Sequence, residues 1–259
     1  MLSDKLATDV RIERVKIGLF NRLTLHQVCV ADTMGDTLLR ADVISAKIEY
    51  SPLLEGRISL RTASLLDGYI RLYQRKPQEA PNYQFVADAL SSKEKDKPSS
   101  TDFSLGSLII RRLSLSYDKR YLPQTPRRFN PSHVSVKDLD ANISLKRLTA
   151  DSINLRVRSL AFSEQSGFAV RKIAFRMAYG SGHLRLGGFH LELPNSIVSE
   201  DVFEAHWHTD TQRPWFETLE CEGQLTDARI ALQDLSPFVT LPPGLLTKEQ
   251  RAEEEDSPY

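Results

Sequence analysis

The stretch EAHWHTD carries the residues of this chain best suited to bind a metal ion. His206 and His208 lie two residues apart, so on a strand both rings would point to the same face, together with Glu204 and Asp210. Two imidazoles presented in this way hold zinc when further ligands complete the coordination shell. The sequence identifies no third ligand beside this pair. We therefore expect no metal site and interpret both histidines as part of the solvent-facing side of a strand.

Other sequence patterns that support catalysis are missing or weak. The chain contains no GxGxxG, no GxxxxGK[ST] and no GxSxG motif. Asp138 and Asp140 share a polar face with nothing nearby to raise a pKa, so we interpret both carboxylates as solvated. The remaining histidines each stand alone among polar residues and are interpreted as structural: His26, His133, His183 and His190. We expect no catalytic residue, no cofactor and no enzyme activity.

Composition excludes further classes of protein. The 259 residues include 34 basic and 34 acidic side chains, so the chain lacks the net positive charge that attracts nucleic acid. No window approaches the ~18 consecutive apolar residues of a membrane-spanning helix. Cys29 and Cys221 are compatible either with two thiols or with one disulfide.

The apolar residues alternate with polar ones as in a half-buried strand, but the alternation slips by one residue in the middle of eight stretches. In FAVRKIAFRMAY, for example, Phe168 and Val170 are in phase, Arg171 and Lys172 follow, and Ile173 starts the opposite phase. The slips fall at residues 13–14, 26–27, 61–62, 111–112, 137–138, 158–159, 171–172 and 187–188. An inserted residue is what a β-bulge adds, and it returns the apolar side chains to one face while bending the strand. A two-residue hairpin at each slip is the alternative, but its arms would be shorter than the usual ~5–6 residues.

Turn and helix signals fall between the expected strands. Asp67-Gly68 predicts a hairpin, and residues 134–193 predict a four-stranded antiparallel meander. A helix of about two turns is expected in PNYQFVADAL with Asn82 as N-cap, and a short one in DLSPFV with Ser236 as cap before Pro237.

We divide the chain into four regions. They are an N-terminal β region at 1–90, a polar linker at 91–101, a β-meander at 102–240 and a disordered tail at 241–259. The predicted fold class is all-β, with roughly a dozen long antiparallel strands and two or three short helices. One apolar face per strand fits two architectures: a sandwich, in which two such faces meet, and an open bent sheet, in which the face lines a groove. A sandwich is the more common result of alternating strands, whereas the bulges favour the bent sheet.

The sequence resembles the N-terminal part of the TamB family, the inner-membrane subunit of the translocation and assembly module, within the AsmA-like group. The resemblance rests on GLFNRLTL, on GDTLLRADVISAKIEYSPLLEGRISLRTASLLDGYIRLYQ, on PNYQFVADALSS, on RFNPSHVSVKDLDANISLKRLTADSINLRVRSLAFSEQSGF, on LELPNS and on DLSPFV. These segments run from about Val10 to Val239, in the order and spacing of the family.

The resemblance implies an elongated, taco-like β-groove in the periplasm of a bacterium with two membranes. It implies a function in phospholipid transport and outer-membrane biogenesis, with phospholipid acyl chains as cargo, no catalysis and no nucleic acid. In the full-length protein it implies an inner-membrane anchor and an outer-membrane assembly partner of the TamA type. We expect this chain to be a fragment without the anchor. The alternative is a scaffold that assists outer-membrane protein assembly through its strand edges.

If the sheet is open, the groove is lined by apolar side chains in phase with one another. The candidates are Val15, Ile17, Leu113, Leu115, Ile143, Leu145, Ile173, Phe175, Met177, Phe189, Leu191 and Leu193.

Overall fold

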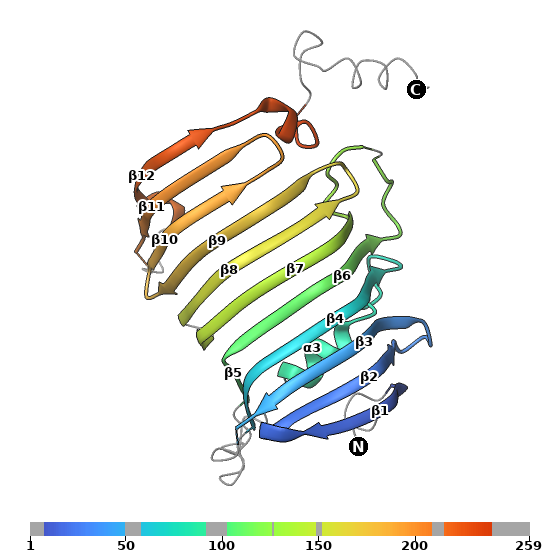
Figure 1. Ribbon diagram of the computed structural model, residues 1–259. Coiled ribbons are helices and arrows are strands. Elements are labelled where there is room, and N and C mark those ends of the chain that lie inside the picture. Colours follow the sequence, from blue (N-terminus) through green and yellow to red (C-terminus); the bar gives the residue numbers. More distant parts are fainter. Residues whose placement is uncertain are drawn as a thin grey trace.

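The protein forms one long, open β-sheet (Figure 1). The computed structural model describes residues 8–49, 58–91, 103–125, 127–148, 152–208 and 215–239. Within them twelve strands pair in the order β1-β2-β3-β4-β6-β7-β8-β9-β10-β11-β12, and β5 also pairs with β4. The strands are β1 (Val10–Gly18), β2 (Arg22–Ala31), β3 (Thr37–Ile48), β4 (Ile58–Gln74), β5 (Phe103–Leu105), β6 (Ser107–Lys119), β7 (His133–Leu148), β8 (Ser152–Glu164), β9 (Ala169–Gly180), β10 (His183–Glu192), β11 (Ile197–His206) and β12 (Glu220–Arg229). The predicted fold class, an all-β chain in a bent, elongated sheet, is confirmed.

Neighbouring strands are antiparallel with one departure from the expected pattern. Strands β7 to β10 form the predicted antiparallel meander. Strand β4, however, runs parallel to both β5 and β6. A parallel pair cannot be joined by a tight turn, so the chain has to cross from one end of the sheet to the other between β4 and β6. The helix α3 (Gln84–Ser91) lies in this connection, and Figure 1 shows it beside β3 and β4.

The predicted bulges are confirmed at the slips in β4 and in β6 to β10, whereas the register is continuous through residues 13–14 of β1 and 26–27 of β2. Shifts in the register of strand pairing accompany the slips in β4 and in β6 to β10. Four slips contain a residue with left-handed backbone conformation: Gln27 (φ 51°), Arg112 (φ 50°), Asp138 (φ 51°) and Gly188 (φ 60°). Three of these are not glycine, and asparagine and aspartate are the other residues that enter this region most readily. Residue type alone therefore does not identify the bending positions.

From β2 to β6 the left-handed residues lie at the same level on neighbouring strands and form a crease in this part of the sheet. Gln27, Asp42, Asp67 and Arg112 occupy this level on β2, β3, β4 and β6. Their side chains join along it: Gln27 Nε2 donates to Asp42 Oδ1 (3.2 Å), and the Arg112 guanidinium donates two hydrogen bonds to Asp67 (2.5 and 2.6 Å). The backbone N–H of Arg112 donates to Asp140 Oδ1 (2.8 Å). Asp140 thus serves as a backbone acceptor at the crease, and the interpretation of this carboxylate as merely solvated is wrong.

The hairpin predicted at Asp67-Gly68 is wrong, because β4 runs unbroken through it. Asp67 has the positive φ of 51° that a hairpin turn would need, but here that conformation serves the crease. A Cβ atom on Gly68 would overlap the carbonyl oxygen of Arg40 and would lie 3.1 Å from Ala41 Cα on β3. Glycine is needed at this position because the neighbouring backbone approaches so closely.

The helices are short. The predicted helix is confirmed as α3, but Asn82 is not its N-cap, because α3 begins at Gln84 and Asn82 Oδ1 accepts the Tyr73 N–H. The short helix predicted to begin after Ser236 in DLSPFV is wrong in position. The 3₁₀-helix η3 (Leu232–Leu235) precedes Ser236, which is its C-cap. Two further 3₁₀ turns are η1 (Leu19–Asn21) and η2 (Trp215–Thr218).

The remaining sequence predictions concern the linker, the tail, membrane-spanning helices and the two cysteines. The polar linker at 91–101, apart from Ser91, and the tail at 241–259 lie outside the described residues. Within the described part of the chain, no helix has the length and apolar character needed to cross a membrane. Cys29 on β2 and Cys221 on β12 are free thiols at opposite ends of the sheet.

We expect Gly68→Ala to lower the free energy of unfolding by about 2 kcal/mol, because the added methyl group forces the backbones of β3 and β4 apart. Gly187→Ala is the matched control, since a Cβ atom there has no neighbour closer than 3.7 Å. It should change stability by less than about 0.5 kcal/mol. Urea denaturation monitored by circular dichroism measures both. Equal losses in the two variants would contradict the close approach at Gly68.

Candidate functional site: the apolar face of the sheet

Side chains of one phase form a continuous apolar face across the sheet. One row of this face takes one residue from each of eleven strands, and each of these residues lies directly opposite the next one in the strand register. This row consists of Val15, Leu25, Ile44, Leu65, Ile110, Ala141, Leu160, Ile173, Leu191, Val198 and Ala228. It contains no polar side chain and crosses eleven strands, which at about 4.8 Å between neighbours is roughly 48 Å.

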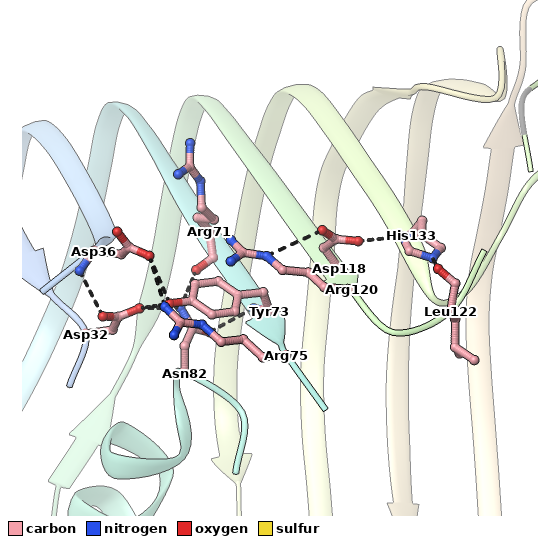
Figure 2. Close-up of polar contacts among 10 residues, drawn as sticks. All are labelled: Asp32, Asp36, Arg71, Tyr73, Arg75, Asn82, Asp118, Arg120, Leu122 and His133. Atoms are coloured by element: carbon pink, nitrogen blue, oxygen red, sulfur yellow. Dashed lines mark hydrogen bonds and ion pairs between the residues drawn. The ribbon is translucent and has the colours of Figure 1, made fainter. Parts of the chain in front are cut away.

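No second sheet covers this face. Among the described residues all strands belong to a single open sheet, and each strand packs chiefly against its neighbours in it. The sandwich interpretation is therefore wrong. Yet Leu113 at the crease is only 2 % exposed, and Ala41 at the same level is also buried. Side chains of a single layer become this inaccessible when the sheet curves around them. In Figure 2 the strands arch accordingly. The burial of Leu113 and Ala41 places the apolar face on the inner side of the resulting trough.

The predicted groove residues all lie on this inner face but differ in depth. Leu113 and Leu193 are buried. Val15 and Ile17 on the edge strand β1 are 56 % and 85 % exposed. The other predicted residues are half-buried: Leu115, Ile143, Leu145, Ile173, Phe175, Met177, Phe189 and Leu191. The half-buried set is the part of the face that remains accessible to an apolar ligand.

Aromatic rings gather on one rim of the trough, where β8 ends and β9 begins. The Phe238 ring, from the segment after η3, lies 4.9 Å from that of Phe168 and 5.1 Å from that of Phe129. Phe168 in turn lies 6.1 Å from Phe162 on β8. This cluster joins three segments that are distant in sequence, and no pattern in the sequence predicted it.

Asp234 anchors the same C-terminal segment. It accepts hydrogen bonds from the Asn195 backbone and side chain (both 3.0 Å) and from the Ser196 hydroxyl (2.5 Å). Burial raises the pKa of this carboxyl, but the hydrogen bonds outweigh burial and hold the pKa below its ordinary value. The ionised form of Asp234 therefore fixes η3 to the turn between β10 and β11.

A polar cluster lies along the same strand ends of the sheet as the aromatic cluster, where β4 ends and the chain continues toward α3 (Figure 2). Asp32, in the turn between β2 and β3, accepts hydrogen bonds from the Tyr73 hydroxyl (2.7 Å) and from Asn82 Nδ2 (3.2 Å). Asn82 also pairs with the β4 backbone, because its Oδ1 accepts the Tyr73 N–H (2.8 Å). The Arg120 guanidinium lies over the Tyr73 ring at 3.8 Å.

The pKa values of two groups in this cluster, Asp32 and Tyr73, are shifted further away from neutral pH. Burial raises the pKa of Asp32, but hydrogen bonds from Tyr73, from the Met34 and Asp36 backbones and from Asn82 outweigh it, so the pKa lies below the ordinary 3.8. Burial, followed by the hydrogen bond to Asp32, raises the pKa of Tyr73 to about 12. Neither group exchanges a proton near pH 7, which suits a structural tie between elements.

His133, which is buried, has both ring nitrogens engaged. Nδ1 lies 2.5 Å from Asp118 Oδ1 and Nε2 lies 3.0 Å from the Leu122 carbonyl oxygen. This agrees with its interpretation as structural. His183 differs, because its ring stacks on that of His206. The interpretation of His183 as a lone histidine is therefore wrong.

The pair predicted from EAHWHTD does not form. His206 ends β11, whereas His208 lies beyond the strand and its backbone N–H donates to Thr218 Oγ1 (2.9 Å). Asp210 lies outside the described residues. The group that does form is His183, Glu204 and His206.

Comparison with known proteins gives no relative for this chain: no protein-family model matches it, and none of the curated proteins is significantly similar.

The depth of each apolar residue predicts its contribution to stability. Leu113→Ala should lower the free energy of unfolding by about 3 kcal/mol, because it leaves a cavity in the buried crease. Ile173→Ala should cost only about 1 kcal/mol, because that side chain is already half exposed. Urea denaturation of both variants gives the comparison. A loss at Ile173 as large as that at Leu113 would mean that Ile173 is a core residue and not part of an accessible face.

The Asp32 hydrogen bonds predict a pH dependence. The folded-state pKa is lowered, so the stabilisation is complete above the ordinary value of 3.8 and is lost as the pH falls below it toward the folded pKa. Asp32→Asn should lower the free energy of unfolding at pH 7 by about 3 kcal/mol, through lost hydrogen bonds to a charged group. It should also flatten the decline below about pH 4 in urea titrations. An unchanged decline would assign the acid sensitivity to other carboxylates, such as Asp234.

Proposed function

We propose that the apolar face of the sheet is a conduit for lipid acyl chains, along which they bind and move without chemical change. The observation that carries this proposal is the unbroken apolar row across eleven strands of a sheet against which, among the described residues, no other sheet packs. An apolar surface of this extent is seldom left bare in a soluble domain, and it is typical of a binding surface.

The chemistry of the face specifies an apolar ligand of no fixed shape. The row from Val15 to Ala228 has no hydrogen-bonding side chain that would orient a sugar or a nucleotide. Charged groups, such as the Asp67–Arg112 pair, follow the crease as part of the polar phase of the strands. An acyl chain gains free energy from burial alone and needs no directional contact.

On the resemblance to the TamB family we propose a setting for this conduit. The chain would be a segment of a periplasmic protein that carries phospholipid between the inner and outer membranes. The full-length protein would be anchored in the inner membrane and would work with an outer-membrane assembly partner of the TamA type. The open trough supports this setting, because a bridge between membranes needs a groove that continues along its length.

A second candidate function is a scaffold that recruits a partner strand. Within the described residues, β1 and β12 each have one neighbour in the sheet. Every residue of β12 is exposed, and Leu225 on it is 61 % exposed. A free strand of this kind can pair with an extended segment of another protein, as in outer-membrane protein assembly.

The first test is native mass spectrometry of the purified chain, followed by extraction and identification of bound lipid. We expect copurified phospholipid. We also expect the chain to extract fluorescent phosphatidylethanolamine from vesicles of phosphatidylethanolamine and phosphatidylglycerol. Phe175→Glu and Leu191→Glu should lower bound lipid at least tenfold, because each places a charge on the half-buried inner face.

Val202→Glu is the matched control for these variants. Val202 is an exposed apolar residue of β11 in the opposite phase, next to inward-facing Phe203, so the same change there should leave lipid binding intact. Circular dichroism establishes that each variant is folded. A folded natural chain that carries no lipid and extracts none would overturn the conduit and favour the scaffold.

A further inference from the structure

His183 and His206 form a cross-strand pair at the ends of β10 and β11. The two residues lie directly opposite each other in the antiparallel register. Their rings are stacked, with centroids 4.4 Å apart and planes inclined by 9°. Directly opposed residues on antiparallel strands bring their Cβ atoms within about 5 Å, close enough for both imidazoles to contact one ion.

Glu204 adds a carboxylate to this pair. It precedes His206 by two residues and therefore shares its face of the sheet. One ligand atom from each of His183, Glu204 and His206 lies within 4.8 Å of the others. Glu204 Oε2 is 3.8 Å from His206 Nε2, while its Oε1 accepts a hydrogen bond from Arg185 Nη1 (2.5 Å). The carboxylate is thus already oriented by a second residue, as metal-binding carboxylates commonly are.

The third observation concerns His183 itself. Its Nε2 atom is buried and has no hydrogen-bond partner. A buried polar atom without a partner is uncommon and costs about 1–3 kcal/mol. Coordination of a cation by this nitrogen would remove that cost.

We propose that His183, Glu204 and His206 form a binding site for a divalent transition-metal ion of the zinc class. Two imidazoles and one carboxylate are a common ligand set for zinc, whereas magnesium and calcium prefer sets of oxygen atoms. Zinc–nitrogen bonds are about 2.0–2.1 Å long, so the rings tilt out of their stack to bring both nitrogens to the ion. Glu220, opposite His206 on β12, or a water molecule completes the coordination.

The ion would join β10 to β11 next to the exposed edge strand β12. The charged groups that face the pair are Arg185 on β10, Glu204 on β11 and Glu220 and Glu222 on β12, and His183 lies opposite uncharged Gly180 on β9. Carboxylates outnumber the single guanidinium in this set, so the local charge favours a cation. The site lies on the face opposite the trough, because Ala205 and Phe203 between these residues belong to the inner face.

Isothermal titration of the full chain with zinc chloride at pH 7.5 tests the proposal. We expect one ion per chain with a dissociation constant in the micromolar range or below. His183→Ala and His206→Ala should each weaken binding at least tenfold, and Glu204→Gln should weaken it severalfold. Magnesium chloride should give no binding.

His190→Ala and His208→Ala are matched controls. His190 lies on the same strand as His183 with its Nδ1 3.0 Å from Ser199 Oγ, and His208 lies outside the cluster. Both variants should bind zinc like the natural chain. The absorption spectrum of the cobalt-loaded natural chain gives a measurement that needs no variant, since tetrahedral nitrogen–oxygen coordination produces intense visible bands.

Two results would overturn the proposal: a zinc dissociation constant above about 1 mM for the natural chain, or equal affinities in the natural chain and in folded His183→Ala and His206→Ala variants. If these variants do not fold, absence of the tetrahedral cobalt spectrum in the natural chain overturns it in their place.

Discussion

Neighbouring strands share one ladder of backbone hydrogen bonds, so a strand in a sheet can bend sharply only where its neighbours bend too. This constraint explains the crease. Gln27, Asp67 and Arg112 take left-handed backbone conformations at the same level on β2, β4 and β6. The backbone N–H of Arg112 bonds to Asp140 instead of joining the ladder. The curvature that follows buries Leu113 without a second layer of structure, and it converts a flat apolar surface into a trough.

Much of this fold could be predicted from the sequence because period-two alternation is strong and the slips in it are regular. The slip at residues 111–112, for example, marks the bend at Arg112. The hairpin prediction at Asp67-Gly68 was wrong because a hairpin and a crease both require a positive φ, and the residue types do not distinguish a hairpin from a crease. The parallel pairing of β4 with β6 was not predictable either, since the alternation within a strand carries no information on the direction of its neighbour.

The candidate sites, like the fold, could be predicted from the sequence only in part. Parity along each strand was enough to place Phe175, Leu191 and the other groove residues on one face. Their depth was not predictable, because the difference between buried Leu113 and exposed Ile17 arises from curvature and from distance to the sheet edge. The meeting of His183 with His206 depends on the register of the β10–β11 hairpin, which a search for closely spaced ligands in sequence does not detect.

Within the described chain, each interior strand of this sheet packs chiefly against its neighbours in the sheet, and the edge strands β1 and β12 have one neighbour each. Such an architecture is one-dimensional in the sense of solenoid repeats, so its stability is close to a sum of nearest-neighbour terms. A hairpin inserted between two strands would lengthen the trough while leaving its cross-section elsewhere unchanged, provided that the new strands bend at the common level. The span of the molecule is therefore set by the number of hairpins, and a lineage could adjust it to a wider or narrower gap by duplication alone.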